Sequence, residues 1–364
     1  MHSVPSKQLK VGQIVAENVV SKKGQIIVNK FTCLSRQMIS QILNYRIEQV
    51  NIIDGEIPAQ TLESIERKQQ VEKTYLKKIF EKPDFKEFKK RYTSALKLME
   101  NNLNQIIFRN VPIDQPALIT DSIALFEQYD TSYELFSVIH EMQNIDSSTQ
   151  AHSLNVSIIS RLIGTWIGMS REDLDLLTLA RVLHDIGKSR IPHVNLLKPG
   201  NLTPQEYEFI KKHTIFGYEA IKDQKLDKRI KDAVLLHHER YDGSGYPFGY
   251  SGDKLCTFAC IISIADVYDA MTSRRCYHDS ICPFDVISIF ESEGLEKYHP
   301  DLIITFLKKI ASSFLGSNVL LSNEEAAQIV FLTDKLTRPI IKLAKSNEII
   351  KLEERPDLYI QAII

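Results

Sequence analysis

Apolar residues recur at helical spacing along residues 116–321, and no internal repeat interrupts them. Two helix starts stand out within this range. Ser170 and Asp173 resemble a capping box, and residues 203–206 (TPQE) form a fuller one with proline at the first helical position. The pattern therefore predicts one helix after another, and so a mainly α domain that we place at residues 116–325.

Residues 1–56 have a different pattern, in which short apolar stretches alternate with turn residues. Two apolar stretches flank Lys22-Lys23-Gly24, a helix pattern follows, and a third apolar stretch precedes Asp54-Gly55. These segments are residues 14–20, 25–28, 35–45 and 49–53. They predict a small N-terminal α/β domain, whose role the pattern does not indicate.

Residues 57–115 are rich in lysine, with apolar positions at loose helical spacing and an interruption at Pro83. The favoured interpretation is a helical linker with a solvated charged face. The alternative is a stalk that transmits a signal or joins two copies in a homodimer. Residues 326–364 contain Arg338-Pro339 and the apolar run 340–343, and we expect a closing helix and short strands packed on the helical domain.

Composition narrows the classes of protein only a little. The chain has 364 residues, 43% of them hydrophobic and 25% charged, with a net charge of −1. Such a balance provides no global basic field for a nucleic-acid polymer. The N-terminus has no signal-peptide stretch, and the longest apolar run, near residues 256–271, contains two aspartates and is too short to span a bilayer. Five cysteines without a pairing pattern fit a reducing cytoplasm.

The most informative side chains are imidazoles and carboxylates in the middle third of the chain. They are His152, His184, Asp185, His213, His237, His238 and Asp266. Imidazole nitrogens and carboxylate oxygens without thiolates suit iron, manganese or another divalent transition ion. The set is too large for one metal and about right for two, and paired metals are a standard device for attacking phosphate esters.

The predicted helices suggest how these side chains could meet. His184 and Asp185 come at the end of a helix that starts at Arg171, and Gly187 should terminate that helix. His213 should end the helix that starts at Pro204, and His237-His238 should end another. Asp266 lies inside the apolar helix 258–271, where an unpaired carboxylate would cost several kcal/mol and so requires a cation or strong donors.

The sequence ERYDGSGYP follows His238 directly. Gly243 and Gly245 would let the backbone approach a ligand and offer amides to phosphate oxygens, and Tyr246 could stack on a base. Lys188, just beyond the His-Asp pair, could bind a non-bridging phosphate oxygen. Arg274 and Arg275 could bind a second phosphate, and the alternative interpretation is a solvated helix end.

Three separated motifs resemble the HD-GYP domain, the subset of the HD phosphohydrolase superfamily that hydrolyses cyclic di-GMP. They are HDIGK at 184–188, HHERYDGSGYP at 237–247 and ADVYDAMTSRR at 265–275, and LLKPGNLTPQEYEFIKKH at 196–213 also matches. The resemblance covers residues 116–321 and implies an HD-type helical bundle with a bi- or trinuclear iron or manganese centre.

Carried onto this chain, the resemblance makes all seven of those imidazoles and carboxylates the metal ligands. Lys188 and Arg275 match phosphate-contacting positions, with Asp185 and Lys188 taken as catalytic. The motif loop corresponds to Gly243, Gly245, Tyr246 and Pro247. Ser148 stands where trinuclear members carry a glutamate, so we expect two metals.

The resemblance implies hydrolysis of cyclic di-GMP to pGpG and/or GMP. Cys276, His278 and Asp279 depart from the family's basic pattern after Arg275, which keeps the mixed dinucleotide 3′,3′-cyclic GMP-AMP, or a general HD nucleotidase, as alternatives. A non-catalytic receptor that binds cyclic di-GMP and signals through residues 1–110 is a third. The motif loop argues against a fourth, a di-iron oxygenase of HD fold.

Overall fold

A computed structural model describes most of the chain. It covers residues 2–10, 13–17, 19–20, 26–28, 34, 38–39, 42–43, 45, 47–53, 83–109, 111–127, 134–136, 138–139, 142, 149–192, 203–273 and 281–364. The chain divides into two compact units, one largely within residues 1–74 and the other within residues 75–364.

The N-terminal unit contains two antiparallel strand pairs. β1 (His2–Pro5) pairs with β4 (Gln49–Ile52), and β2 (Val19–Val20) pairs with β3 (Ile26–Val28). Apolar side chains from these strands, including Val4, Val50 and Ile52, form a small core of their own. The expected hairpin strands and third strand are confirmed, whereas the turn at 22–24 and parts of the expected helix lie outside the described residues.

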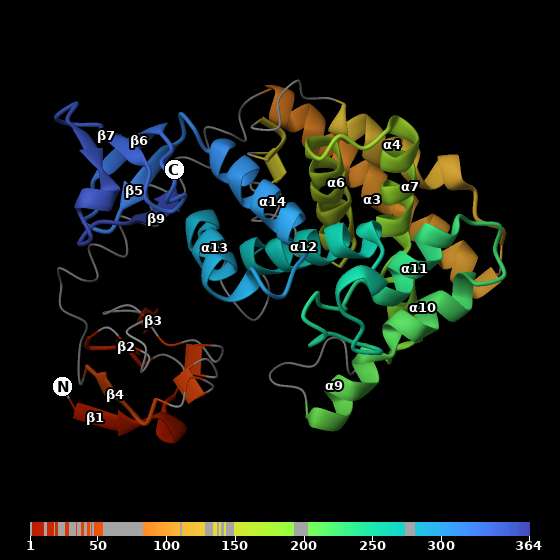
Figure 1. The fold of residues 1–364 in the computed structure, drawn as a ribbon, viewed down its shortest axis with the longest axis horizontal. Helices are drawn as coiled ribbons and strands as arrows, with labels where there is room; N and C mark the ends of the chain where they lie inside the picture. The colour runs from red at the N-terminus through yellow and green to blue at the C-terminus, as the bar shows by residue number, and fades with distance from the viewer. Residues whose placement is uncertain are drawn as a thin grey trace. The chain divides into compact units, whose positions relative to one another are not determined.

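The second unit is helical, as Figure 1 shows. Its α-helices are α3 (Pro83–Arg109), α4 (Gln115–Phe126), α6 (Thr149–Trp166), α7 (Arg171–Leu183), α9 (Pro204–Lys211), α10 (His213–Ile221), α11 (Lys228–Leu236), α12 (Thr257–Thr272), α13 (Pro283–Ile289) and α14 (Pro300–Ser312). The prediction of a mainly α fold is confirmed. Within the described part of the chain, no helix combines the length and apolar character needed to cross a membrane.

Both predicted helix starts are confirmed by their hydrogen bonds. The Ser170 hydroxyl accepts the Asp173 amide at 3.1 Å and begins α7. Thr203 and Glu206 form the reciprocal box at the start of α9, where each side chain accepts the other residue's backbone amide. These bonds satisfy amides that the first turn of a helix otherwise leaves without partners.

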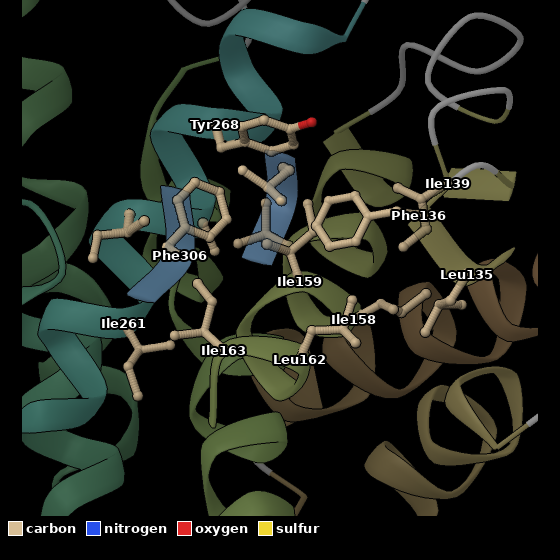
Figure 2. Close-up of a cluster of buried hydrophobic side chains, with 14 of the residues drawn as sticks. Leu135, Phe136, Ile139, Ile158, Ile159, Leu162, Ile163, Ile261, Tyr268 and Phe306 are labelled. Carbon is tan, nitrogen blue, oxygen red and sulfur yellow. The ribbon is translucent and has the colours of Figure 1, made fainter. Parts of the chain in front are cut away.

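Helix α6 is central to the core and packs against α3, α4, α7, α12 and α14. Figure 2 shows its aliphatic side chains, such as Ile159 and Leu162, among aromatic rings from other segments. Tyr268 of α12 lies 6.0 Å from Phe136 and 5.3 Å from Phe306 between ring centroids, in edge-to-face arrangements. The interior is therefore a continuous apolar cluster, into which any polar ligand set must be built.

The expected linker at 57–115 needs correction for the part that the structure describes. Helix α3 begins at Pro83, where the sequence predicted an interruption, but it does not stand apart as a stalk. Its residues Phe88, Tyr92 and Met99 are buried in the same core as α6. Burial of these side chains makes α3 part of the helical unit. Residues 57–82 lie outside the described residues.

The tail also differs from the expected closing helix with short strands. Residues 313–364 contain no α-helix and form an antiparallel sheet in the order β8-β7-β6-β5-β9. The strands are β5 (Asn318–Leu321), β6 (Ala326–Phe331), β7 (Ile340–Leu343), β8 (Ile349–Lys351) and β9 (Ile360–Ile363). Alternate residues such as Val319, Ile329 and Ile341 face the core, a period of two that a helix cannot use. Because β5 pairs with β6, the sheet begins before the boundary expected at 325.

Replacing Phe306 by alanine should destabilise the helical unit by roughly 3–5 kcal/mol, because its ring is fully buried between Tyr268 and Phe290. Denaturant unfolding monitored by circular dichroism would measure the loss. The matched control is Phe331→Ala, since that ring is 63% exposed and its removal should change stability by no more than about 0.5 kcal/mol. Equal effects of the two substitutions would contradict this account of the core.

Candidate metal centre

The helices bring the predicted ligands together from separate parts of the chain. His152 and Asp266 project from the interiors of α6 and α12. His184 and His237 are the C-cap residues that directly follow α7 and α11, and Asp185 and His238 come next. His213 does not end the helix from Pro204 as expected, because α9 ends at Lys211 and His213 begins α10. Helix ends let successive side chains turn toward one point, which explains how the adjacent pairs can both contribute.

The donor atoms form two groups that share Asp185. One group comprises Asp185, His213, His237 and His238, and the other comprises His152, His184 and Asp185, with the donors of each group within 4.8 Å of one another. Asp266 borders the second group, since its Oδ1 lies 2.9 Å from His152 Nε2 and 4.0 Å from His184 Nε2. All seven predicted ligands therefore lie in one site.

The two oxygens of Asp185 face different groups. Oδ2 lies 3.0 Å from His184 Nε2, whereas Oδ1 lies 3.4 Å from His213 Nε2 and 3.9 Å from His237 Nε2. Oδ1 is buried yet accepts no hydrogen bond from the described residues. A buried carboxylate oxygen without a donor fits a cation, and the surrounding nitrogen and oxygen donors suit a divalent transition ion.

Outer hydrogen bonds orient three of the imidazoles. The Nδ1 atoms of His184, His213 and His237 lie 2.9, 2.7 and 3.0 Å from backbone carbonyls three residues earlier. A carbonyl only accepts, so each Nδ1 carries the proton and each Nε2 is left as an unprotonated donor facing the centre. The three carbonyls, of Arg181, Ile210 and Val234, lie in the last turns of α7, α9 and α11.

His152 is oriented by a carboxylate that the sequence analysis did not assign. Its Nδ1 lies 2.5 Å from Oδ2 of Asp269, which is fully buried one turn after Asp266 on α12. Burial alone would lower the pKa of His152, but its hydrogen bonds with Asp266 and Asp269 raise it. A second carboxylate one turn along the same apolar helix was the signal that could have revealed this role.

Arg181 is a second residue that the sequence analysis missed. Its side chain is fully buried, one turn before His184, and its guanidinium contacts that imidazole. Burial lowers the pKa of Arg181 to about 10, against the opposing influence of Asp266, Asp185 and Asp269. The group therefore stays charged at neutral pH and offsets part of the negative charge of the three carboxylates.

The ionisation of the site suits metal binding at neutral pH. Burial lowers the pKa values of His213 and His237 and lowers that of His238 to about 3, so these imidazoles are neutral. Burial alone would raise the pKa of Asp185, but Lys188 and His213 outweigh it and hold that pKa well below its usual range. Metals bind neutral imidazole and ionised carboxylate, which are the forms of these four residues.

Lys188 lies in the short 3-10 helix η2 (Ile186–Arg190), with its ammonium 2.5 Å from Asp185 Oδ2. Gly187, in the same turn, does not end α7 as expected, because the helix ends at Leu183. A Cβ atom on Gly187 would collide with the His213 carbonyl and the Gly217 amide. Glycine is needed here so that α10 can approach η2 and place His213 beside Asp185.

The motif loop keeps its shape through internal bonds rather than by offering free amides. Gly243 has φ +80°, and its amide donates to the Arg240 carbonyl at 2.8 Å, so it is not available for phosphate as expected. A Cβ on Gly245 would collide with the backbone of residues 239–240. Buried Glu239, which the sequence analysis did not assign, accepts the amides of Phe248 and Tyr250 at 2.7 and 3.1 Å.

Tyr246 lies against a candidate metal ligand instead of facing open solvent. Its ring stacks on that of His238, with centroids 4.7 Å apart and planes 29° apart. Pro247 follows through a cis peptide bond. Six residues that the sequence analysis considered for the site lie outside the described residues, and their expected roles stay predictions: Ser148, Arg274, Arg275, Cys276, His278 and Asp279.

Comparison with known proteins agrees with this geometry. Residues 135–302 match the family model described as HD domain. The chain is 36% identical to a cyclic di-GMP phosphodiesterase of Thermotoga maritima over 190 residues. This aligned stretch covers 50% of this chain and 52% of that protein. It is 39% identical over 138 residues to the cyclic di-GMP phosphodiesterase response regulator RpfG of Xanthomonas campestris, 37% of this chain and 36% of that one.

Another relative is named for a different substrate. A 3′3′-cGAMP-specific phosphodiesterase 2 of Vibrio cholerae is 35% identical over 153 residues, covering 41% of this chain and 29% of that protein. The chain thus spans about half or less of the length of these curated relatives. Among solved structures, Bd1817, an HDG"Y"P protein from Bdellovibrio bacteriovorus, has the same fold with a TM-score of 0.51 and 17% identity, over 85% of this chain and 99% of that one.

The matched region therefore resembles HD domains, and its His-Asp pair lies at the centre of a ligand cluster that could hold divalent metal. The chain is also similar to cyclic di-GMP phosphodiesterases, which agrees with the resemblance that the motif loop at 237–247 indicated.

Replacing Asp269 by asparagine should weaken metal binding by roughly 10- to 100-fold, because a neutral amide holds the His152 imidazole less firmly and makes it a poorer donor. Titration with Mn(II), with metal counted per chain, would measure the change. The control is Asp301→Asn, an exposed aspartate at the start of α14. Wild-type metal affinity in the Asp269 variant would rule out the orienting role.

Proposed function

We propose that this protein is a metal-dependent phosphodiesterase that hydrolyses cyclic di-GMP to pGpG and/or GMP. The observation that carries the proposal is the shared carboxylate of Asp185, whose two oxygens face two groups of imidazoles. Such a carboxylate suits two metals, and we propose iron or manganese because the donors are nitrogen and oxygen. The relatives that are named cyclic di-GMP phosphodiesterases support the substrate.

A pair of divalent ions in such a site supplies Lewis-acid stabilisation of the phosphate and activation of water. The chain's own residues would hold and orient the reactants. On one side of Asp185, metal would be held by His213, His237 and His238. On the other side it would be held by His152, His184 and Asp266. The neutral imidazoles and the orienting bonds at their Nδ1 atoms keep the donors in place before substrate arrives.

Lys188 is the group best placed to act on the substrate. Its side chain is 27% exposed while that of Asp185 is 7% exposed, so the ammonium lies between the buried ligands and solvent. There it can donate to a non-bridging phosphate oxygen and stabilise negative charge that grows as water adds to phosphorus. The P–O3′ bond then breaks, and the 3′-oxygen leaves as a hydroxyl after taking a proton.

One specific observation favours a second substrate. Relatives named as 3′3′-cGAMP-specific enzymes match this chain at 32–35% identity, much as the cyclic di-GMP enzymes do. Hydrolysis of both dinucleotides by the same preparation, compared through kcat/KM, would separate the two substrates. A receptor that only binds is the less favoured reading, because a receptor gains nothing from burying so many metal donors.

We further propose that the reaction occurs in the cytoplasm. Cys256, Cys260 and Cys282 are all free thiols, which supports a reducing compartment. A homodimer joined through the helical linker expected at residues 57–115 stays a prediction, which sedimentation of the full chain would test.

Asp185→Ala should abolish turnover of cyclic di-GMP and lower the metal content, since both groups of donors lose their common member. Anaerobically purified protein supplied with Fe(II) or Mn(II) should contain about two metals per chain, and the variant fewer. A variant with wild-type metal content and activity would sink the assignment.

Lys188→Met should separate chemistry from metal binding. It removes a charge from the phosphate side while leaving every proposed ligand in place, so metal content should persist and kcat should fall by roughly 100-fold or more. Quenched-flow or chromatographic detection of pGpG would report kcat. Loss of metal in step with activity would show instead that Lys188 acts through Asp185.

A further inference from the structure

Helix α9 is unusual because it buries none of its side chains, yet its start is secured by a complete capping box. A helix of this kind adds little to the hydrophobic core. It leads directly into His213, and in Figure 1 it projects from the body of the helical unit beyond α10. The surface of α9 is therefore available to bind a ligand close to His213, a proposed metal ligand.

A row of side chains connects the metal centre to this surface. Tyr246 stacks on His238, the Lys211 ammonium lies 5.4 Å from the Tyr246 ring centroid, and the same ammonium lies 4.9 Å from the Tyr207 ring centroid. Tyr207 is at the outer end of the row and is 49% exposed. Because Tyr207 and Lys211 are four residues apart on α9, they share one face of the helix.

These residues have the chemistry of a nucleotide subsite. An exposed aromatic face binds a nucleobase by stacking, and a neighbouring ammonium binds a phosphate oxygen. Lys211 also pairs with Glu208 at 2.7 Å, but that carboxylate is 66% exposed and so competes weakly with a bound phosphate. A cyclic dinucleotide carries a second phosphate and two bases, which a site for one scissile phosphate leaves without partners.

We propose that Tyr207 and Lys211 form a subsite that binds one base and the non-scissile phosphate of the cyclic dinucleotide. This inference rests on the proposed function, because it requires a cyclic dinucleotide at the metal centre. The Tyr246 ring would lie beside the Lys211 ammonium while it packs on His238. The subsite would make the enzyme select dinucleotides over simpler phosphodiesters.

The test compares two substrates in metal-replete protein. Tyr207→Ala should raise KM for cyclic di-GMP by roughly 5- to 100-fold and leave kcat nearly unchanged, since a stacked base contributes equally in the ground and transition states. Lys211→Met should also raise this KM. Neither substitution should alter kinetics on bis(4-nitrophenyl) phosphate, which has one phosphate and no base. Tyr207→Trp should retain the wild-type KM.

The matched control is Phe331→Ala, an exposed aromatic in the C-terminal sheet, with no effect expected on either substrate. Metal content of the α9 variants should equal that of wild type. An unchanged KM for cyclic di-GMP in Tyr207→Ala would overturn the subsite. Equal losses on both substrates would overturn it too, and would assign α9 the task of positioning His213.

Failure of the proposed function can be distinguished from failure of the subsite. If wild-type protein binds cyclic di-GMP without hydrolysing it, calorimetric titration of the same variants tests the subsite through Kd. A weaker Kd in Tyr207→Ala would then support the subsite although the phosphodiesterase proposal had failed. Absence of binding to cyclic di-GMP and 3′,3′-cyclic GMP-AMP would overturn both.

Discussion

The structure of the site depends on one buried carboxylate, Asp185. Its charge is almost fully removed from water, and an isolated carboxylate in such a place would be strongly destabilising. The neighbouring groups offset that cost: Lys188 pairs with one oxygen, Arg181 contributes a buried positive charge, and imidazoles face both oxygens. With its Oδ1 left without a hydrogen-bond donor among the described residues, the arrangement is incomplete in a way that a cation completes.

The helical scaffold places the donors around this carboxylate with little freedom. Two donors come from helix interiors, where α6 and α12 pack against each other through the apolar core. The others come from helix ends, where main-chain carbonyls in the last helical turns orient the rings of His184, His213 and His237. Gly187 allows η2 and α10 to approach closely, so the position of His213 is set by contact between backbones rather than by a flexible side chain.

Burial decreases outward from the metal centre in a manner that fits binding of a large substrate. The imidazoles at the centre are buried and neutral, the motif loop is held by Glu239, and α9 at the edge is exposed but well capped. Tyr246 connects these layers, because one face of its ring meets His238 and the Lys211 ammonium lies near the ring. A ligand that reaches from the metals to Tyr207 would contact every layer.

The sequence by itself determined the helical class, both helix caps and the seven candidate metal donors. These depend on the local spacing of residues and on the chemistry of each side chain, both of which are visible in the sequence. It did not determine that α3 joins the core, that the tail forms a sheet, or that His213 begins a helix. Nor could it assign Asp269, Arg181 or Glu239, whose roles come from single contacts with distant residues such as His152 and Phe248. Those contacts exist only after the helices pack, since burial and hydrogen-bond partners across long separations are properties of the tertiary structure.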